Sequence, residues 1–347
     1  MMHLDRFEAI HLRTPWAPKN LIDRAKLALE TLFKRGKEKL DPFKFEVFSS
    51  EEEAFMQLIL SLIHEKALAE GKNHLLVLDT LRSPFKAILA KFAPLGIQVD
   101  QIPLTPLGTV DLEELKNSFY PTTMGFLFEP FDLMTGVEQP VEEILLACEN
   151  HCPVFLLTKA LFGLQNFSEK IEAIQCDNAL FVPRTYPLSG SKEPDRIFAA
   201  ATEIQECFAR RVEEGMQLLY LRRFFERAIE SMGGEIFFKT AKREPGTIVF
   251  GFSGIHGELL SYWLCQRGIF TSIGGGQRPS LHRHLSSIGF EDSQAYTAVH
   301  VSFSPDLEEN TLQEVLITIE ECLRLTKRSA ELAIDMLYDR GTYDERF

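Results

Sequence analysis

Short apolar runs alternate with amphipathic segments through the first half of the chain, and this alternation constrains the fold most. The runs HLLVLD (His74–Asp79), MGFLFEP (Met124–Pro130) and PVFLLT (Pro153–Thr158) have the length and composition of strands that are buried on both faces. Helical periodicity fills the segments between them, as at Pro84–Phe92 and Val141–Glu149. Strands that alternate with helices at this spacing predict a mainly parallel sheet covered by helices.

The remaining patterns divide the chain into two α/β domains. Further strands are expected at 45–48, 97–102 and 178–182, and helices at 20–39 and from the Ser49–Ser50 pair to about Ala69. Two helices are expected over Pro194–Met232, then strands near Phe237 and Val249, and a last helix over 312–336. We therefore predict an N-terminal arm (1–20), a large α/β domain (21–205), a small C-terminal α/β domain with a linking helix (206–336) and a polar tail (337–347).

Composition excludes several classes of function. The formal charge is −13, from 50 acidic and 37 basic side chains, which argues against a nucleic-acid partner. No run approaches the roughly 20 apolar residues of a membrane helix, and the N-terminus lacks the pattern of a signal peptide, so we expect a cytoplasmic protein. The six cysteines are scattered, and we expect free buried thiols and no metal site.

The stretch from Ile248 to Gln277 predicts a strand, a helix, a second strand and a glycine loop in succession. Its helix is expected from about Glu258 to Arg267, ended by Gly268, and the loop is Gly274-Gly275-Gly276. The segments FSGIHGELLSYWL, RGIFTSIGGG and LSSIGF, preceded by MTGVEQPVEEI, resemble the cysteine desulfurases, the NifS-like branch of the class V aminotransferase fold. The resemblance covers nearly the whole chain in order, and it implies an α/β protein of the pyridoxal-phosphate (PLP)-dependent transferase fold type I.

The resemblance also marks the positions where such enzymes hold their cofactor and substrate. The family's phosphate-binding helix start is matched by Ser49 and Ser50, followed by three glutamates, and its ring-stacking histidine by the run that contains Arg82. The remaining matched positions are Asp132 and Thr135 in a substrate-side loop, Thr158 for the pyridine-binding aspartate, Gln277 for the loop cysteine and His300 for a substrate-binding arginine.

The Schiff-base lysine of the family has no clear match. The chain passes from FVPRTYP directly to LSGSKEPDR, so the segment that carries the lysine in the family is absent after the strand expected at 178–182. Two other lysines remain candidates. Lys192 lies in a Ser-Gly-Ser-Lys run that imitates the lost motif, and Lys159 follows a strand end, where burial could lower its pKa.

The resemblance therefore leaves three hypotheses. The leading one is a catalytically degenerate cysteine-desulfurase-like protein that needs no cofactor and acts by binding, as a homodimer or as a partner of an iron–sulfur assembly component. The second is an active PLP enzyme that uses Lys192 or Lys159. The third is a non-covalent binder of a phosphorylated metabolite, held by Ser49, Ser50 and Thr135.

Overall fold

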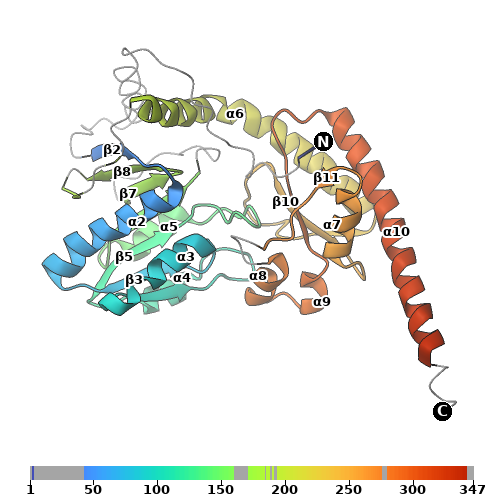
Figure 1. Ribbon diagram of the computed structural model, residues 1–347, viewed down its shortest axis with the longest axis horizontal. Helices are drawn as coiled ribbons and strands as arrows, with labels where there is room; N and C mark the ends of the chain where they lie inside the picture. Colours follow the sequence, from blue (N-terminus) through green and yellow to red (C-terminus); the bar gives the residue numbers. More distant parts are fainter. Residues whose placement is uncertain are drawn as a thin grey trace. The chain divides into compact units, whose positions relative to one another are not determined.

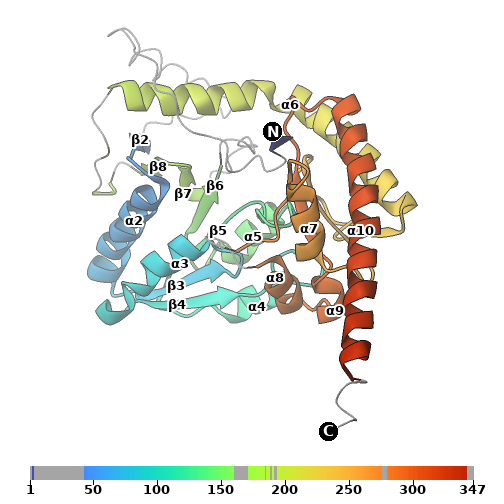
Figure 2. The ribbon, with the colours of Figure 1, turned by 45° about the vertical axis from the view of Figure 1, so that its right-hand side comes forward.

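The computed structural model describes residues 2–3, 43–159, 171–183, 185–187, 190, 194–275 and 280–341. These residues form two compact units. The sheet unit holds the described residues of 43–133 and 137–213, and the C-terminal unit holds residues 2–3, Met134–Gly136 and the described residues from Glu214 onward. Both units are drawn in Figures 1 and 2. No helix in the described part of the chain is long and apolar enough to cross a membrane.

A seven-stranded sheet in the order β2-β8-β7-β6-β5-β3-β4 forms the centre of the sheet unit. Neighbouring strands from β7 to β4 are parallel, whereas β8 is antiparallel to both β7 and β2. The strands are β2 (Phe43–Val47), β3 (His74–Leu78), β4 (Gln98–Ile102), β5 (Thr123–Phe128), β6 (Val154–Thr158), β7 (Ile171–Cys176) and β8 (Ala179–Pro183). The predicted fold class, a mainly parallel sheet with helices, is confirmed.

Helices cover this sheet because its central strands β3, β5 and β6 are apolar and buried on both faces. The helices are α2 (Glu51–Leu62), which continues as a π-helical stretch η1 (Ile63–Leu68), α3 (Ser83–Ala90), a 3-10 turn η2 (Ala93–Leu95), α4 (Leu112–Asn117) and α5 (Val141–Cys148). Phe55 of α2 and Phe85 of α3 stack with ring centroids 4.1 Å apart, in one core with Val77 and Leu127 of the strands. Alternate strand residues such as Phe126 are equally buried, as expected for a sheet covered on both sides.

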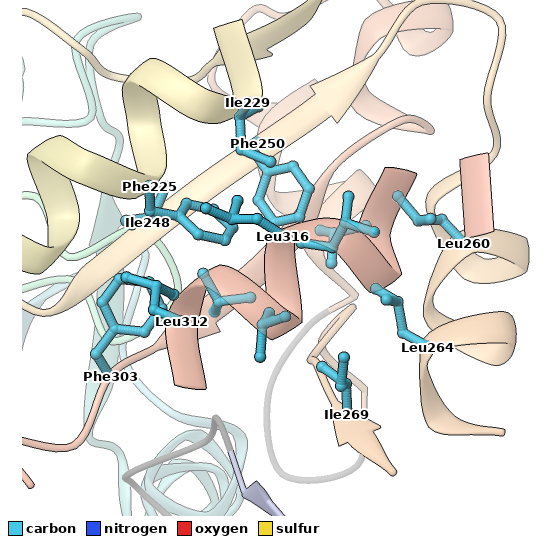
Figure 3. Packing of buried hydrophobic residues seen from close by; sticks show 14 of the residues in the cluster. Phe225, Ile229, Ile248, Phe250, Leu260, Leu264, Ile269, Phe303, Leu312 and Leu316 are labelled. Carbon is cyan, nitrogen blue, oxygen red and sulfur yellow. The ribbon is translucent and has the colours of Figure 1, made fainter. Parts of the chain in front are cut away.

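The C-terminal unit is built on a three-stranded antiparallel sheet in the order β12-β10-β9. Its elements are β9 (Gly234–Ile236), β10 (Thr247–Phe252), α7 (Gly257–Cys265), α8 (Leu281–Ser287), α9 (Asp292–Ala295), β12 (Val299–Ser302) and α10 (Glu309–Gly341). A two-residue β1 (Met2–His3) pairs in parallel with β11 (Ile269–Phe270). Figure 3 shows the core, where Phe225 meets Phe250 and Phe303 edge-on at 5.4 and 5.3 Å between ring centroids.

The structure differs from the expectations at four elements. Residues 194–231 form one continuous helix, α6 (Pro194–Ser231), where two were predicted. Strand β7 was not predicted, and the strand expected at 269–273 is only the two-residue β11. The helix α10 extends to Gly341, so the first residues of the predicted tail are helical. The helix predicted over 20–39 lies outside the described residues.

Candidate functional site

The candidate site lies in the sheet unit, where the carboxyl ends of four parallel strands meet the start of α2. Open α/β sheets bind ligands at this edge because the loops that leave the strands converge there. Glu129, Lys159 and Asp177 come directly after β5, β6 and β7, and Arg82 lies in the loop between β3 and α3. Glu51 is the first residue of α2. We call these five residues the Glu51 cluster.

The side chains of the Glu51 cluster form a continuous network of ion pairs. The two carboxylate oxygens of Glu51 bind different cations, with Oε1 2.6 Å from a terminal nitrogen of Arg82 and Oε2 2.6 Å from Nζ of Lys159. Nε of Arg82 donates to Glu129 at 2.8 Å, and Nζ of Lys159 lies 3.2 Å from the Asp177 carboxylate. The network therefore joins three acidic and two basic residues and carries a formal charge of −1.

Most of the network is removed from solvent. The side chains of Glu129 and Arg82 are 4% and 13% exposed. The guanidinium of Arg82 also covers the ring of Phe85, at 4.3 Å from the ring centroid, which is a favourable cation–π contact. The amide of Gln175 donates to the backbone carbonyls of Glu51 (2.9 Å) and Asp177 (3.1 Å), and so ties the start of α2 to the end of β7.

The pKa values of Glu51 and Glu129 shift in opposite directions, although burial raises both. Burial alone would raise the pKa of Glu51, but the charges and hydrogen bonds of Arg82 and Lys159 outweigh it and hold that pKa below its usual range. For Glu129 burial prevails over the attraction of Arg82 and raises the pKa. The two cations thus favour an ionised Glu51, whereas burial disfavours an ionised Glu129.

Two buried oxygens of the site have no hydrogen-bond partner among the described residues. They are Oε2 of Glu129 and the side-chain oxygen of Gln175. The Gln175 oxygen is an acceptor and calls for a donor such as water, because a buried acceptor without a donor is unfavourable. The Glu129 carboxyl accepts when it is ionised and can donate when it is protonated.

The start of α2 uses its own side chains to satisfy its backbone. Oγ of Ser50 accepts a hydrogen bond from the backbone N–H of Glu53 at 3.1 Å. The Glu53 carboxylate in turn accepts from the backbone N–H of Ser49 at 2.9 Å and from the Ser49 hydroxyl. This arrangement resembles a capping box in which Glu53 reaches Ser49, one residue before the N-cap, and the first turn carries three glutamates. An arriving phosphate would meet these carboxylates, which repel it.

Strands β7 and β8, the last two of this sheet along the chain, form a tight hairpin. Strands β7 and β8 pair antiparallel, with Cys176 opposite Ala179, so that only Asp177 and Asn178 connect them. Asp177 adopts a φ of +49°, which Asp and Asn tolerate in turns. We had placed the absent lysine segment after β8. The hairpin residues Asp177 and Asn178 provide no amine, and the amine of Lys159 is paired with Glu51 and Asp177.

The other positions marked by the resemblance are placed as follows. Thr158 ends β6 and is 5% exposed, with its hydroxyl 3.4 Å from the Lys159 carbonyl. Asp132 is buried in the sheet unit, whereas Thr135 belongs to the C-terminal unit and is also buried. His300 lies on β12, is 1% exposed, and its backbone pairs with Ser272. Lys192 and Gln277 lie outside the described residues.

The sequence did not reveal the network itself. From the sequence, Glu51 is one of three glutamates that follow the serine pair, Arg82 belongs to the run in place of a histidine, and Glu129 and Asp177 are not singled out. One signal was available, since a charged residue follows β5, β6 and β7 alike. Charges at the carboxyl ends of adjacent parallel strands must lie near one another.

Comparison with known proteins supports the fold. No protein-family model and no curated protein sequence matches the chain. Among solved structures, a NifS-like protein matches with a TM-score of 0.75 and 17% identity, over 88% of each chain. A NifS-like protein from Rickettsia africae ESF-5 matches with a TM-score of 0.69 and 14% identity, also over 88% of each chain. The apo cysteine desulfurase of Thermococcus onnurineus NA1 matches with a TM-score of 0.65 and 12% identity, over 92% of this chain and 88% of that one.

These similarities define the class of fold. The chain has the PLP-dependent transferase fold type I, in the form seen in NifS-like proteins and cysteine desulfurases. Fold alone does not assign the chemistry, so the residues at the cofactor position decide what the site can do.

The described residues of the site do not fit PLP. A phosphate would meet Glu51, Glu52 and Glu53 at the start of α2, where Ser49 and Ser50 already serve the capping box. Thr158 offers no carboxylate for a pyridinium nitrogen. Lys159 is held between two carboxylates, whereas a Schiff base needs a neutral amine.

Proposed function

We propose that the chain is a catalytically degenerate relative of the cysteine desulfurases that acts by binding. The observation that carries the proposal is the double ion pair of Glu51. Its carboxylate lies at the start of α2, where this fold would receive a phosphate, and it is bound by Arg82 and Lys159. The cations that could serve an anionic cofactor are therefore occupied by the chain's own carboxylate.

The binding partner follows from the fold by analogy alone. We propose that the protein is a homodimer or a partner of an iron–sulfur assembly component, because the related structures include a NifS-like protein and a cysteine desulfurase. Size-exclusion chromatography with light scattering tests whether the protein is a homodimer. A mass of twice 39.6 kDa supports the dimer, and a mass of 39.6 kDa contradicts it.

The test of the degenerate site is the absorbance spectrum of the purified protein with added PLP, before and after borohydride. We expect no internal-aldimine band, no borohydride-stable adduct and no sulfide from cysteine. A reducible band would overturn the proposal and support the active-enzyme hypothesis. Lys192→Ala and Lys159→Ala would then identify the lysine, because only the variant that lacks the responsible amine loses the band.

The phosphorylated-metabolite hypothesis has a separate test. Inorganic phosphate and pyridoxamine 5′-phosphate, which cannot form an aldimine with a lysine, probe non-covalent binding at the start of α2. We expect neither to raise the thermal unfolding midpoint beyond the effect of chloride at equal ionic strength. A saturable rise that Ser50→Ala abolishes would establish a phosphate site and contradict the role proposed for Glu51.

A further inference from the structure

A pair of cysteines lies at the opposite end of β6 from Lys159. Cys148 is the last residue of α5, and Cys152 stands two residues before β6. No disulfide joins any of the six cysteines, all of which lie in the described part of the chain; Cys148, Cys176 and Cys322 are buried, whereas Cys152, Cys207 and Cys265 are not. Cys148 and Cys152 are the one pair of cysteines that lie close together in the sequence. Cys148 is buried, whereas Cys152 is half-buried.

The backbone holds the two cysteines close together. The N–H of Cys152 donates to the carbonyl of Cys148 at 3.1 Å, so the chain makes one further helical turn after α5. Residues four apart on a helix have Cβ atoms about 5–6 Å apart, and a disulfide needs about 3.5–4.5 Å. The residues between them, Glu149 to His151, form a turn outside regular helix and strand, where a small backbone adjustment can close that difference.

The two thiols lie close enough to influence each other's ionisation. A hydrogen bond to the thiol of Cys152 and, second to it, burial raise the pKa of the Cys148 thiol well above its usual range. Cys148 therefore does not react first as a thiolate. The half-buried Cys152 is the thiol that an external reagent meets first.

Reagents can reach the pair through an open hollow. Its volume is about 370 Å³, and its walls are the end of α5, the turn and the start of β6, with both cysteines among them. Pockets for small ligands begin at about 300 Å³. The ring of His151 in this turn stacks on the ring of Phe119, which follows α4, with centroids 4.5 Å apart. This contact helps to hold the turn in place.

We propose that Cys148 and Cys152 form a redox-active dithiol that is oxidised by small organic disulfides. The Cys152 thiolate attacks one sulfur of the disulfide, whose S–S bond breaks and releases one thiol. The Cys148 sulfur then attacks Sγ of Cys152 and displaces the second thiol, which leaves an intramolecular disulfide. The two thiol protons of the protein end on the two released thiols, so the protein loses two electrons and the small disulfide gains them.

The experiment uses the full chain and glutathione disulfide as the probe. Trypsin releases a peptide from Asn117 to Lys159 that contains no other cysteine, so its mass reports the pair directly. We expect this peptide to lose the mass of two hydrogens and to regain it with dithiothreitol. Cys265, which is exposed and stands alone, serves as the internal control and is expected to gain one glutathione.

Two variants distinguish a pair from two independent thiols. In Cys148→Ser, the reaction stops at a mixed disulfide, and the peptide gains one glutathione. In Cys152→Ser, the buried Cys148 stays unmodified while Cys265 still reacts. A wild-type peptide that gains one or two glutathiones, or that stays unchanged while Cys265 reacts, overturns the proposal. The wild-type result alone decides, so a variant that fails to fold leaves the test intact.

Discussion

The carboxylate of Glu51 and the guanidinium of Arg82 lie 2.6 Å apart, although 31 residues separate them in sequence. The pair joins the first turn of α2 to the loop that leaves β3, and Lys159 extends it to the end of β6. Side chains of the chain itself thus neutralise a helix start and strand ends that form an anion site in many α/β proteins. The predictions below test the energetic weight of this arrangement.

Removal of Glu51 should destabilise the protein far more than removal of a surface carboxylate. Glu51→Ala leaves two largely buried cations with only their second partners, Glu129 and Asp177, and we expect a loss of about 3 kcal/mol in the free energy of unfolding. The matched control is Glu113→Ala, which breaks an exposed pair with Lys116 and should cost less than about 1 kcal/mol. Urea denaturation measures both, and equal losses would contradict a structural role for Glu51.

A small carboxylate should restore the variant. In Glu51→Ala, the space between Arg82 and Lys159 is open to an anion, so formate should raise the thermal unfolding midpoint beyond the effect of chloride at the same ionic strength. The wild-type protein should respond equally to both salts. A rise of similar size in the wild-type protein would show that formate acts elsewhere.

The stability of the protein should depend on pH through Glu51 in one direction and through Glu129 in the other. The folded pKa of Glu51 is lowered, so its stabilisation is present above the usual carboxyl range and is lost as the pH falls through the folded value. The folded pKa of Glu129 is raised, so its contribution improves as the pH falls from that value towards the usual range.

Glutamine variants separate the two contributions. Between pH about 7 and about 3, a range that extends below the usual carboxyl pKa, Glu51→Gln should lose less unfolding free energy than the wild type, because the titrating carboxylate is gone. Glu129→Gln should lose more, because it lacks the compensating proton uptake. Chemical denaturation across this range measures both slopes, and identical slopes in all three proteins would refute the assignment.

Two glycines in helices should respond oppositely to alanine. Gly215 lies within α6, and a Cβ there would meet only Pro245 at 3.9 Å, so Gly215→Ala should stabilise by about 0.5–1 kcal/mol through helix propensity. Gly257 opens α7, and a Cβ there would lie 2.5 Å from the carbonyl oxygen of Ala298. Gly257→Ala should therefore destabilise by about 1–3 kcal/mol, because backbone must move. Thermal unfolding of the two variants provides the comparison.

The sequence predicted the buried strands well because their chemistry is unambiguous. Runs such as HLLVLD contain almost nothing but strand-forming apolar residues, and β3 was found at His74–Leu78 as expected. Strand β7 was missed because Glu172 and Gln175 interrupt its apolar pattern. Gln175 is nevertheless 1% exposed, since its amide binds two backbone carbonyls, and this compensation is invisible in sequence.

The sequence marked some positions of the candidate site but not the ion pairs that join them. The resemblance marked the start of α2 and the end of β6, where Glu51 and Lys159 indeed meet at 2.6 Å. Glu129 and Arg82 could not be paired from sequence, because they are 47 residues apart and only the parallel pairing of β3 with β5 brings their loops together. Long-range ion pairs of this kind follow from strand order, which local periodicity does not contain.

The single helix α6 has a consequence for any attempt to divide the protein. The boundary between the two compact units falls between Glu213 and Glu214, near the middle of its 38 residues. Each backbone N–H of a helix bonds to the carbonyl four residues earlier, so a cut at that boundary would strip four such bonds and leave two ragged helix ends. If the gene were divided there, each fragment would have an uncapped, solvent-exposed helix end. Division after Ser231 would keep the helix whole, but the C-terminal unit would then lack Phe225 and Ile229 of its core.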